Sequence, residues 1–244
     1  MLIVILAGTG TALATGLGAI PVFFMGRRAE ALRPLLWGFA AGAMVVAALV
    51  GLLGPALNEG STAAAAGGAA AGILFLVAAR TGLNSGEVHF GSLGGTDVRS
   101  SLLVFGVLFV HSLPEGLAIG AAYASETEGL GLFVILAIAL QNVPEGTSIA
   151  LPMQSAGFGR AQQFWAAVGT SLPQPFGAVI AFVAVEAIEP LLPASLAFAG
   201  TAMLALVALE MLPRSVAAGG WGKTLIGALP GTAMMLALAL AIGV

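Results

Sequence analysis

Long apolar runs, broken only by short polar segments, are the feature that most limits how this chain can fold. The hydrocarbon core of a bilayer is about 30 Å thick, and about 20 apolar residues in a helix cross it. Runs of that length recur along the whole chain, and only 8% of its residues are charged. A soluble globular chain carries about 25% charged residues. The chain cannot cover a water-facing surface, so we predict an all-α, polytopic membrane protein.

We expect one transmembrane domain, residues 1–244, with eight helices. The apolar start has no basic residue before Arg27, which favours a retained helix over a cleaved signal peptide. Only Asn58–Gly60 divides the second run from the third, so seven helices are the alternative. The predicted ranges are 1–25, 34–57, 61–81, 100–124, 129–153, 162–185, 194–213 and 222–243.

The positions of the charges favour eight helices. Every Lys and Arg lies in the break after the first, third, fifth or seventh range or within two residues of that break. The charged residues of the other breaks are all acidic, such as Glu126 and Glu189. Lys and Arg concentrate on the cytoplasmic side of membranes. We therefore place the polar segment 82–99 in the cytoplasm and both termini outside it. The expected location is a cell membrane, the plasma or inner membrane of a prokaryote.

Four ionisable residues lie within the predicted spans: His111, Glu115, Glu145 and Glu210. A charged group at membrane depth costs at least ~2.5 kcal/mol on insertion scales and usually faces a cavity or a partner. Three of the four belong to two similar segments, HSLPEG at 111–116 and QNVPEG at 141–146. These segments are the first candidates for a functional site.

The spacing in these segments favours a metal site. His111 and Glu115 share a helix face, as do Gln141 and Glu145, because residues four apart lie above one another. Imidazole, carboxylate and amide oxygens are ligands for divalent cations, and imidazole favours zinc or neighbouring transition metals. Two carboxylates also balance the charge of one such ion.

The prolines and glycines of the two segments predict local distortion. Pro114 and Pro144 each remove a backbone donor and should kink the fourth and fifth helices. Gly116 and Gly146 remove bulk at the same level and allow close helix approach. Two alternatives to a metal site stay open: the glutamates could be hydrogen-bonded at simple proline kinks, or the same residues could form a proton relay.

Further polar positions in or near the spans are candidates for the path or for a second site. Gln174 is either a ligand or a helix–helix hydrogen bond, and Glu210 either an exit-path acid or an interfacial charge. Met44 could be a soft ligand, although methionine is usually a packing residue. His89, with Glu87 in the 82–99 segment, could catch an ion or be simply solvated.

The chain resembles the ZIP (Zrt/Irt-like) divalent metal transporters, in particular their GufA-like branch. The resemblance rests on the two segments above and on the stretches GFAAGAMVVAALVGLLGPAL, IALPMQSAGFGRAQQFWAAVGTSLPQPFGAV and AFAGTAMLALVALEMLP. It implies eight helices with both termini outside and, in many members, a binuclear metal centre. It also implies an elevator-like or rocking movement without a nucleotide.

Carried over residue by residue, the resemblance implies one complete metal site and one incomplete one. His111, Glu115, Gln141 and Glu145 stand where the family places ligands, with Met44 a looser match. At the second site this chain has Ser112, Asn142 and Gln174, where relatives have amide or carboxylate residues. No added carboxylate then offsets the repulsion between two ions. We expect one strong site and a weak or vacant second one.

The sequence thus predicts import of a divalent transition metal, zinc first, with Fe²⁺, Mn²⁺ and Cd²⁺ as alternatives. Rival functions are a metal-binding sensor or structural subunit that moves nothing, and a proton-coupled transporter of another solute. A metalloprotease would need an HExxH-like motif that the chain lacks, so we expect no enzyme and no cofactor beyond the transported ion. The expected partners are metal ions and the bilayer, with a homodimer left open, and not nucleic acid.

Overall fold

The computed structural model describes residues 1–58, 61–85 and 96–244, and within these ranges it contains helices and no strand. Predicted candidate His89 lies outside the described residues, as does most of the 82–99 segment. In chain order the helical segments are α1 Leu2–Leu17, α2 Ile20–Met25, η1 Gly26–Leu32, α3 Arg33–Val46, η2 Ala47–Leu53, α4 Gly54–Asn58, α5 Thr62–Ser85, α6 Thr96–Ala124, α7 Leu130–Ser155, α8 Arg160–Thr170, α9 Pro173–Ala187, α10 Leu191–Leu206, η3 Val207–Met211 and α11 Leu212–Ile242.

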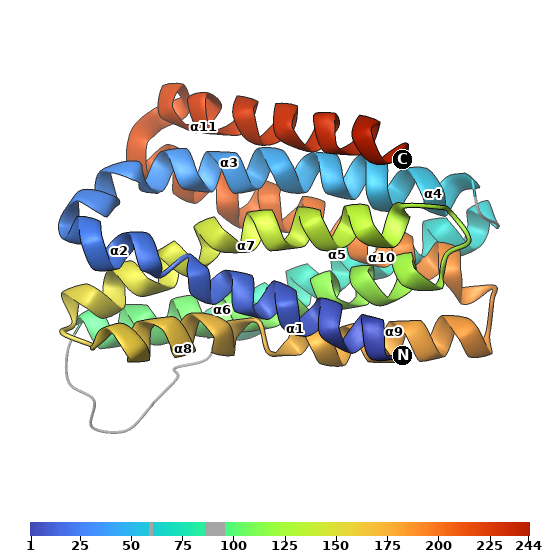
Figure 1. Ribbon diagram of the computed structural model, residues 1–244, viewed down its shortest axis with the longest axis horizontal. Coiled ribbons are helices and arrows are strands. Elements are labelled where there is room, and N and C mark those ends of the chain that lie inside the picture. The colour runs from blue at the N-terminus through green and yellow to red at the C-terminus, as the bar shows by residue number, and fades with distance from the viewer. Residues whose placement is uncertain (59–60, 86–95) are drawn as a thin grey trace.

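Six stretches of the described residues are long and apolar enough to cross a membrane. The last has 52 residues and would be about 80 Å long as one straight helix, more than twice the bilayer core. Gly220 interrupts it with φ 73° and ψ 170°, and the chain then runs back beside α3 (Figure 1). The six are Leu2–Met25, Arg28–Asn58, Thr62–Thr81, Leu130–Ser155, Arg160–Ala187 and Leu191–Ile242.

Two of the predicted helices are divided rather than continuous. The predicted helix 1–25 breaks between α1 and α2 at Gly18 and Ala19, and 162–185 breaks between α8 and α9 at Ser171 and Leu172. Pro173 begins α9 and has no N–H to continue the α8 ladder, which explains the second break. Both breaks fall inside the bundle and expose backbone groups that need partners there.

The helices associate in two groups (Figure 1). Helices α1, α6, α7, α8 and α9 pack mainly on one another, while α3 packs on α11 and α5 packs on α10. The groups meet where α6 lies against α10 and α7 lies against α3. The segments that begin with His111 and Gln141, on α6 and α7, are therefore in the group whose members include both divided helices.

Small residues allow the closest of these contacts. A Cβ atom at Gly38 or Gly42 of α3 would collide with the backbone of α11, and one at Gly227 or Gly231 of α11 with the backbone of α3. Without a hydrophobic driving force between helices in lipid, close backbone approach is a main source of attraction. These glycines therefore build the contact between α3 and α11.

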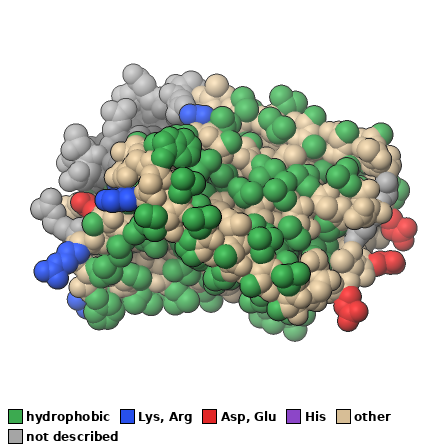
Figure 2. Space-filling model, turned by 90° about the horizontal axis from the view of Figure 1, so that it is seen from above, with side chains coloured by type: hydrophobic (Ala, Val, Ile, Leu, Met, Phe, Trp, Pro, Cys, Tyr) green, Lys and Arg blue, Asp and Glu red, His purple; other side chains and the backbone are tan. Residues whose placement is uncertain are grey.

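The outer surface is apolar along its length and charged at its ends. Large apolar side chains such as Phe24, Leu74 and Leu240 are 80%, 68% and 83% exposed. Figure 2 shows Lys and Arg gathered toward one end of the long axis and most Asp and Glu toward the other. An apolar belt between charged ends is the surface that a bilayer requires.

Candidate metal centre

Helices α6 and α7 pack side by side and carry the two proline-containing segments into the interior. His111 and Glu115 of α6 and Gln141 and Glu145 of α7 are at most 5% exposed. Pro114 and Pro144 lie within these helices, which continue past them. The structure thus buries all four residues of the predicted strong site on two adjacent helices.

Glu115 is the centre of a hydrogen-bonded cluster. Gln141 Nε2 donates to Glu115 Oε1 at 3.0 Å, and Gln174 Nε2 donates to Glu115 Oε2 at 2.6 Å. The carboxylate, fully buried, thus accepts from one amide on α7 and one on α9. Hydrogen bonds to an ionised acceptor are shorter and stronger than neutral ones, which suits a buried carboxylate. Gln174 therefore makes a helix–helix hydrogen bond, one of the two roles predicted for it, and its partner is a residue of the predicted site.

Asn142 extends the cluster toward α1. Its Nδ2 donates to Gln174 Oε1 at 3.2 Å and to the backbone oxygen of Thr11 at 2.8 Å. The residues predicted for a second site, Asn142 and Gln174, are thus joined to Glu115 in one chain of amides. Ser112, the third of that set, is buried on the same helix as Glu115.

Several polar atoms at the centre are buried without a hydrogen-bond partner. They include Gln141 Oε1, Asn142 Oδ1 and the Nδ1 atom of His111. Buried polar atoms are nearly always satisfied in proteins, and an exception points to something further, such as an ion. With its nitrogen on Glu115, Gln141 still has its oxygen free to coordinate a cation. The donor chemistry of the centre therefore fits a divalent metal as substrate.

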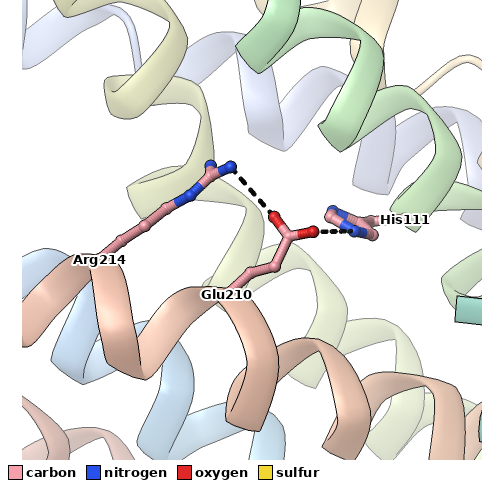
Figure 3. A network of polar contacts seen from close by, with 3 residues as sticks. All are labelled: His111, Glu210 and Arg214. Atoms are coloured by element: carbon pink, nitrogen blue, oxygen red, sulfur yellow. Dashed lines mark ion pairs between the residues drawn. The ribbon is translucent and has the colours of Figure 1, made fainter. Parts of the chain in front are cut away.

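Glu210, for which the sequence left an exit-path acid or an interfacial charge open, lies beside His111 and lines a pocket with it (Figure 3). Glu210 Oε1 lies 3.6 Å from His111 Nε2, and Glu210 Oε2 lies 3.1 Å from an Arg214 guanidinium nitrogen. Glu145 and Trp37 also line this pocket. Glu210 sits in the π-helical segment η3, a distortion that often marks functional positions. His111 thus connects the metal centre to Glu210.

Two carboxylates on separate helices, Glu115 on α6 and Glu145 on α7, supply the negative charge of the centre. Glu145 is close enough to Glu115 for their charges to repel. No group of three or more His, Cys, Asp or Glu side chains in the described part of the chain is arranged to hold a metal ion. A metal centre here therefore needs the amide oxygen of Gln141 together with adjustment of His111, which faces Glu210.

Helix α1 and the α8–α9 break surround the centre with further polar groups. Thr147 Oγ1, on α7, donates to the backbone oxygen of Gly18 at 2.7 Å. Thr15 and Ser171 share a hydroxyl–hydroxyl hydrogen bond of 2.6 Å. These contacts satisfy groups at the two helix breaks. The first joins α7 to the break after α1, and the second joins α1 to the α8–α9 break. Divided helices at membrane depth are tolerated where such partners or a cavity exist.

Several of these participants were not predicted from the sequence. Thr11 and Thr15 stand four apart in an apolar helix, a spacing that could have indicated a polar face. Arg214 stands four residues after Glu210, the spacing of a helical ion pair. Met44 is fully buried on α3 and packs in the main apolar cluster of the described residues, where its suggested ligand role has no polar contact to support it.

Known proteins share these features of sequence. The family described as ZIP zinc transporter matches residues 79–239. The zinc transporter GufA of Myxococcus xanthus is 33% identical over 98% of this chain and 97% of its own. The zinc transporter ZIPB of Bordetella bronchiseptica is 30% identical over 98% of this chain and 81% of its own. The Arabidopsis thaliana protein At3g08650 is 36% identical over 83% of this chain, which spans 33% of that protein's length.

Proposed function

The chain belongs to the ZIP family of zinc transporters, and we propose that it carries a divalent transition-metal ion, with zinc first, across the membrane into the cytoplasm. The observation that carries this proposal is the set of buried ligand atoms on α6 and α7. Two carboxylates, an imidazole and an amide oxygen without a donor are all N or O ligands suited to such an ion.

The proposed topology has eight crossings with both termini outside the cytoplasm. The six apolar stretches, the second crossing within Leu191–Ile242 and the 29-residue α6 support that number. Exposed Arg28 and Arg160 belong to the end that we assign to the cytoplasm, and exposed Glu126 and Glu186 to the opposite end. The membrane would be the plasma or inner membrane of a prokaryote.

The proposed transport site consists of His111, Glu115, Gln141 and Glu145. The two glutamates balance the charge of one dication, so their mutual repulsion favours binding of an ion. Gln141 holds Glu115 through its nitrogen while its oxygen faces the ion. Fe²⁺, Mn²⁺ and Cd²⁺ suit the same ligands, since selection among such metals depends on geometry and supply as well as on affinity.

We propose that a second ion binds weakly or not at all. Two unit charges 4 Å apart repel by about 4 kcal/mol at an effective dielectric constant of 20, and two dications by about 16 kcal/mol. Asn142 and Gln174 add no charge to offset this. The Gln174 nitrogen already donates to Glu115, and the Asn142 nitrogen already donates to Gln174 Oε1. The neutral amide chain takes the place of the second ion.

The proposed route enters at the acidic end, crosses the centre and leaves past Glu210 at the basic end. The division of the bundle into two groups of helices supports movement of one group against the other. The group with α1, α6, α7, α8 and α9 holds all four proposed ligands, so it is the one that would move with the ion. The pathway role suggested for His89 remains a prediction.

Metal uptake into proteoliposomes tests the proposal. Wild-type protein should admit Zn²⁺ to an internal fluorescent indicator, and Fe²⁺, Mn²⁺ and Cd²⁺ can be compared in the same assay. Glu145→Ala and His111→Ala should each reduce Zn²⁺ flux at least tenfold, because each removes a ligand. Glu186→Ala, which changes an exposed glutamate at the acidic end, should not. Near-normal uptake in both site variants would remove the proposed site.

The same assay separates the remaining alternatives. Zn²⁺ binding at equilibrium without flux would indicate a metal-binding sensor or structural subunit instead. The absence of both binding and flux, with movement of another solute, would favour the proton-coupled transporter. The acceptor atoms of Gln141 and Asn142 favour a cation over another solute as the bound species, and the flux measurement separates a transporter from a sensor.

A further inference from the structure

Arg214 is a positive charge inside the pocket that a metal ion would enter. Its guanidinium lies 3.1 Å from Glu210 Oε2 and lines the pocket together with His111 and Glu145. A cation-transporting site gains nothing from a fixed cation on its route, because the two repel. The residue therefore either holds the protein together or takes part in the passage of the ion.

The two members of this ion pair differ in burial. The Glu210 side chain is 7% exposed, whereas the Arg214 side chain is 38% exposed. Glu210 Oε2 has no aligned hydrogen bond, so charge alone holds the pair. The guanidinium also stacks on Trp37, with its carbon 5.8 Å from the ring centroid. Arg214 can move into water at little cost, while Glu210 cannot.

The buried charge of Glu210 links the position of Arg214 to the binding of an ion. Glu210 is buried and needs a positive partner, because an unpaired buried carboxylate is strongly unfavourable. Its other oxygen lies 3.6 Å from His111, too far for a hydrogen bond. Besides His111, Arg214 is thus the side chain that forms an ion pair with Glu210 among the described residues, and its guanidinium is always charged. An ion that binds between His111 and Glu210 would replace it.

We propose that Arg214 is a tethered counter-cation, a positioning residue that exchanges with the transported ion at Glu210. When the ion reaches Glu210, the guanidinium moves along Trp37 toward water. When the ion departs to the cytoplasm, the guanidinium returns, and its repulsion keeps the ion from binding again. Transport then leaves Glu210 compensated at each stage. This inference rests on the proposed function, since it requires a metal ion on this route.

Titration calorimetry with Zn²⁺, together with uptake into proteoliposomes, tests the proposal. Arg214→Gln should bind Zn²⁺ about tenfold more tightly than wild type. Glu210 then has no arginine partner and can contact Zn²⁺, and one charge-assisted contact changes affinity by about tenfold. Zn²⁺ uptake by this variant should be slower, because release is hindered. Arg214→Lys, which restores a positive charge, should return both values toward wild type.

Two further variants locate the effect. In a Glu210→Gln background, Arg214→Gln should leave Zn²⁺ affinity unchanged, because the partner of the arginine is gone. Arg33→Gln removes an equal charge from an exposed position at the start of α3 and should also leave affinity unchanged. The proposal is overturned if Arg214→Gln lowers the melting temperature without tightening Zn²⁺ binding, or if tightening persists without Glu210.

The outcome also separates this inference from the proposed function. If wild-type protein neither binds nor admits Zn²⁺, the proposed function fails. If wild type binds and transports Zn²⁺ while Arg214→Gln does both equally well, the counter-cation role alone is wrong.

Discussion

Glu115 organises the candidate centre because it accepts from amides on two other helices. Gln141 and Gln174 occupy its two oxygens, and Asn142 joins them to α1. Each amide has a nitrogen that donates and an oxygen that accepts, so a hydrogen bond at one end fixes which atom is presented at the other. The nitrogens of Gln141 and Gln174 donate to Glu115, and the oxygens of Gln141 and Asn142 have no hydrogen-bond partner. A single carboxylate thereby fixes how the amides of Gln141 and Gln174 are oriented.

Replacing Gln174 by Glu should create the second site that the amide chain lacks. The new carboxylate would face Glu115 where a 2.6 Å hydrogen bond now lies, and the added negative charge would favour another cation. Calorimetry should then give a ratio of Zn²⁺ to protein chain of one for wild type and a ratio approaching two for Gln174→Glu. Gln162→Glu, the same change at an exposed position, should remain at one. A ratio of one in Gln174→Glu would contradict the role assigned to the amides.

At the scale of elements, the glycines of the two segments face different neighbours. A Cβ at Gly116 would meet the Gln174 backbone, with the Gln174 Cα only 2.8 Å away, whereas one at Gly146 would meet Thr15 of α1. The two segments are similar in sequence but pack against α9 and α1 respectively. The repeated motif therefore gathers helices from both sides of the centre.

Gly116→Ala should loosen the α6–α9 contact and disturb Gln174. Overpacking of this kind costs about 1–3 kcal/mol, which corresponds to a melting temperature roughly 2–10 °C lower in detergent for a chain of this size. Gly67→Ala on α5, where a Cβ would meet nothing within 4 Å, is the matched control. Equal melting temperatures for the two variants would show that α6 and α9 are not held this closely.

The sequence could predict the polar residues of the candidate site, but not the contacts that these residues make with distant helices. His111, Glu115, Gln141 and Glu145 could be singled out because charge and amide groups stand out in apolar helices. Whether they bind metal remains a prediction. The hydrogen bond between Thr15 and Ser171 could not be predicted, because it depends on which distant helix lies beside the α8–α9 break. Likewise, nothing local could indicate that Asn142 reaches the Thr11 backbone.

At the scale of the whole molecule, charge and apolar surface together suggest its orientation. The apolar length predicted a membrane protein, and the family match and the apolar helices support that class. Eight crossings and the placement of the termini depend on the pattern of Lys and Arg. Apolar length alone could not settle the number, because the 52-residue stretch hides a reversal at Gly220.

Cysteine accessibility tests the orientation, and the chain has no cysteine of its own. Glu128→Cys and Arg28→Cys place single thiols at exposed positions in segments that we assign to opposite sides. A membrane-impermeant maleimide added to intact cells should label Glu128→Cys. It should label Arg28→Cys only after the membrane is permeabilised. The reverse pattern would invert the direction of the proposed transport.

Zn²⁺ stoichiometry at equilibrium is the most direct test of the central claim, that one ion held by His111, Glu115, Gln141 and Glu145 is the transported species. Calorimetry on purified protein in detergent should give one strongly bound Zn²⁺ per chain, lost in Glu145→Ala and retained in Glu186→Ala. Two comparably bound ions per chain, or one ion that survives Glu145→Ala, would contradict it.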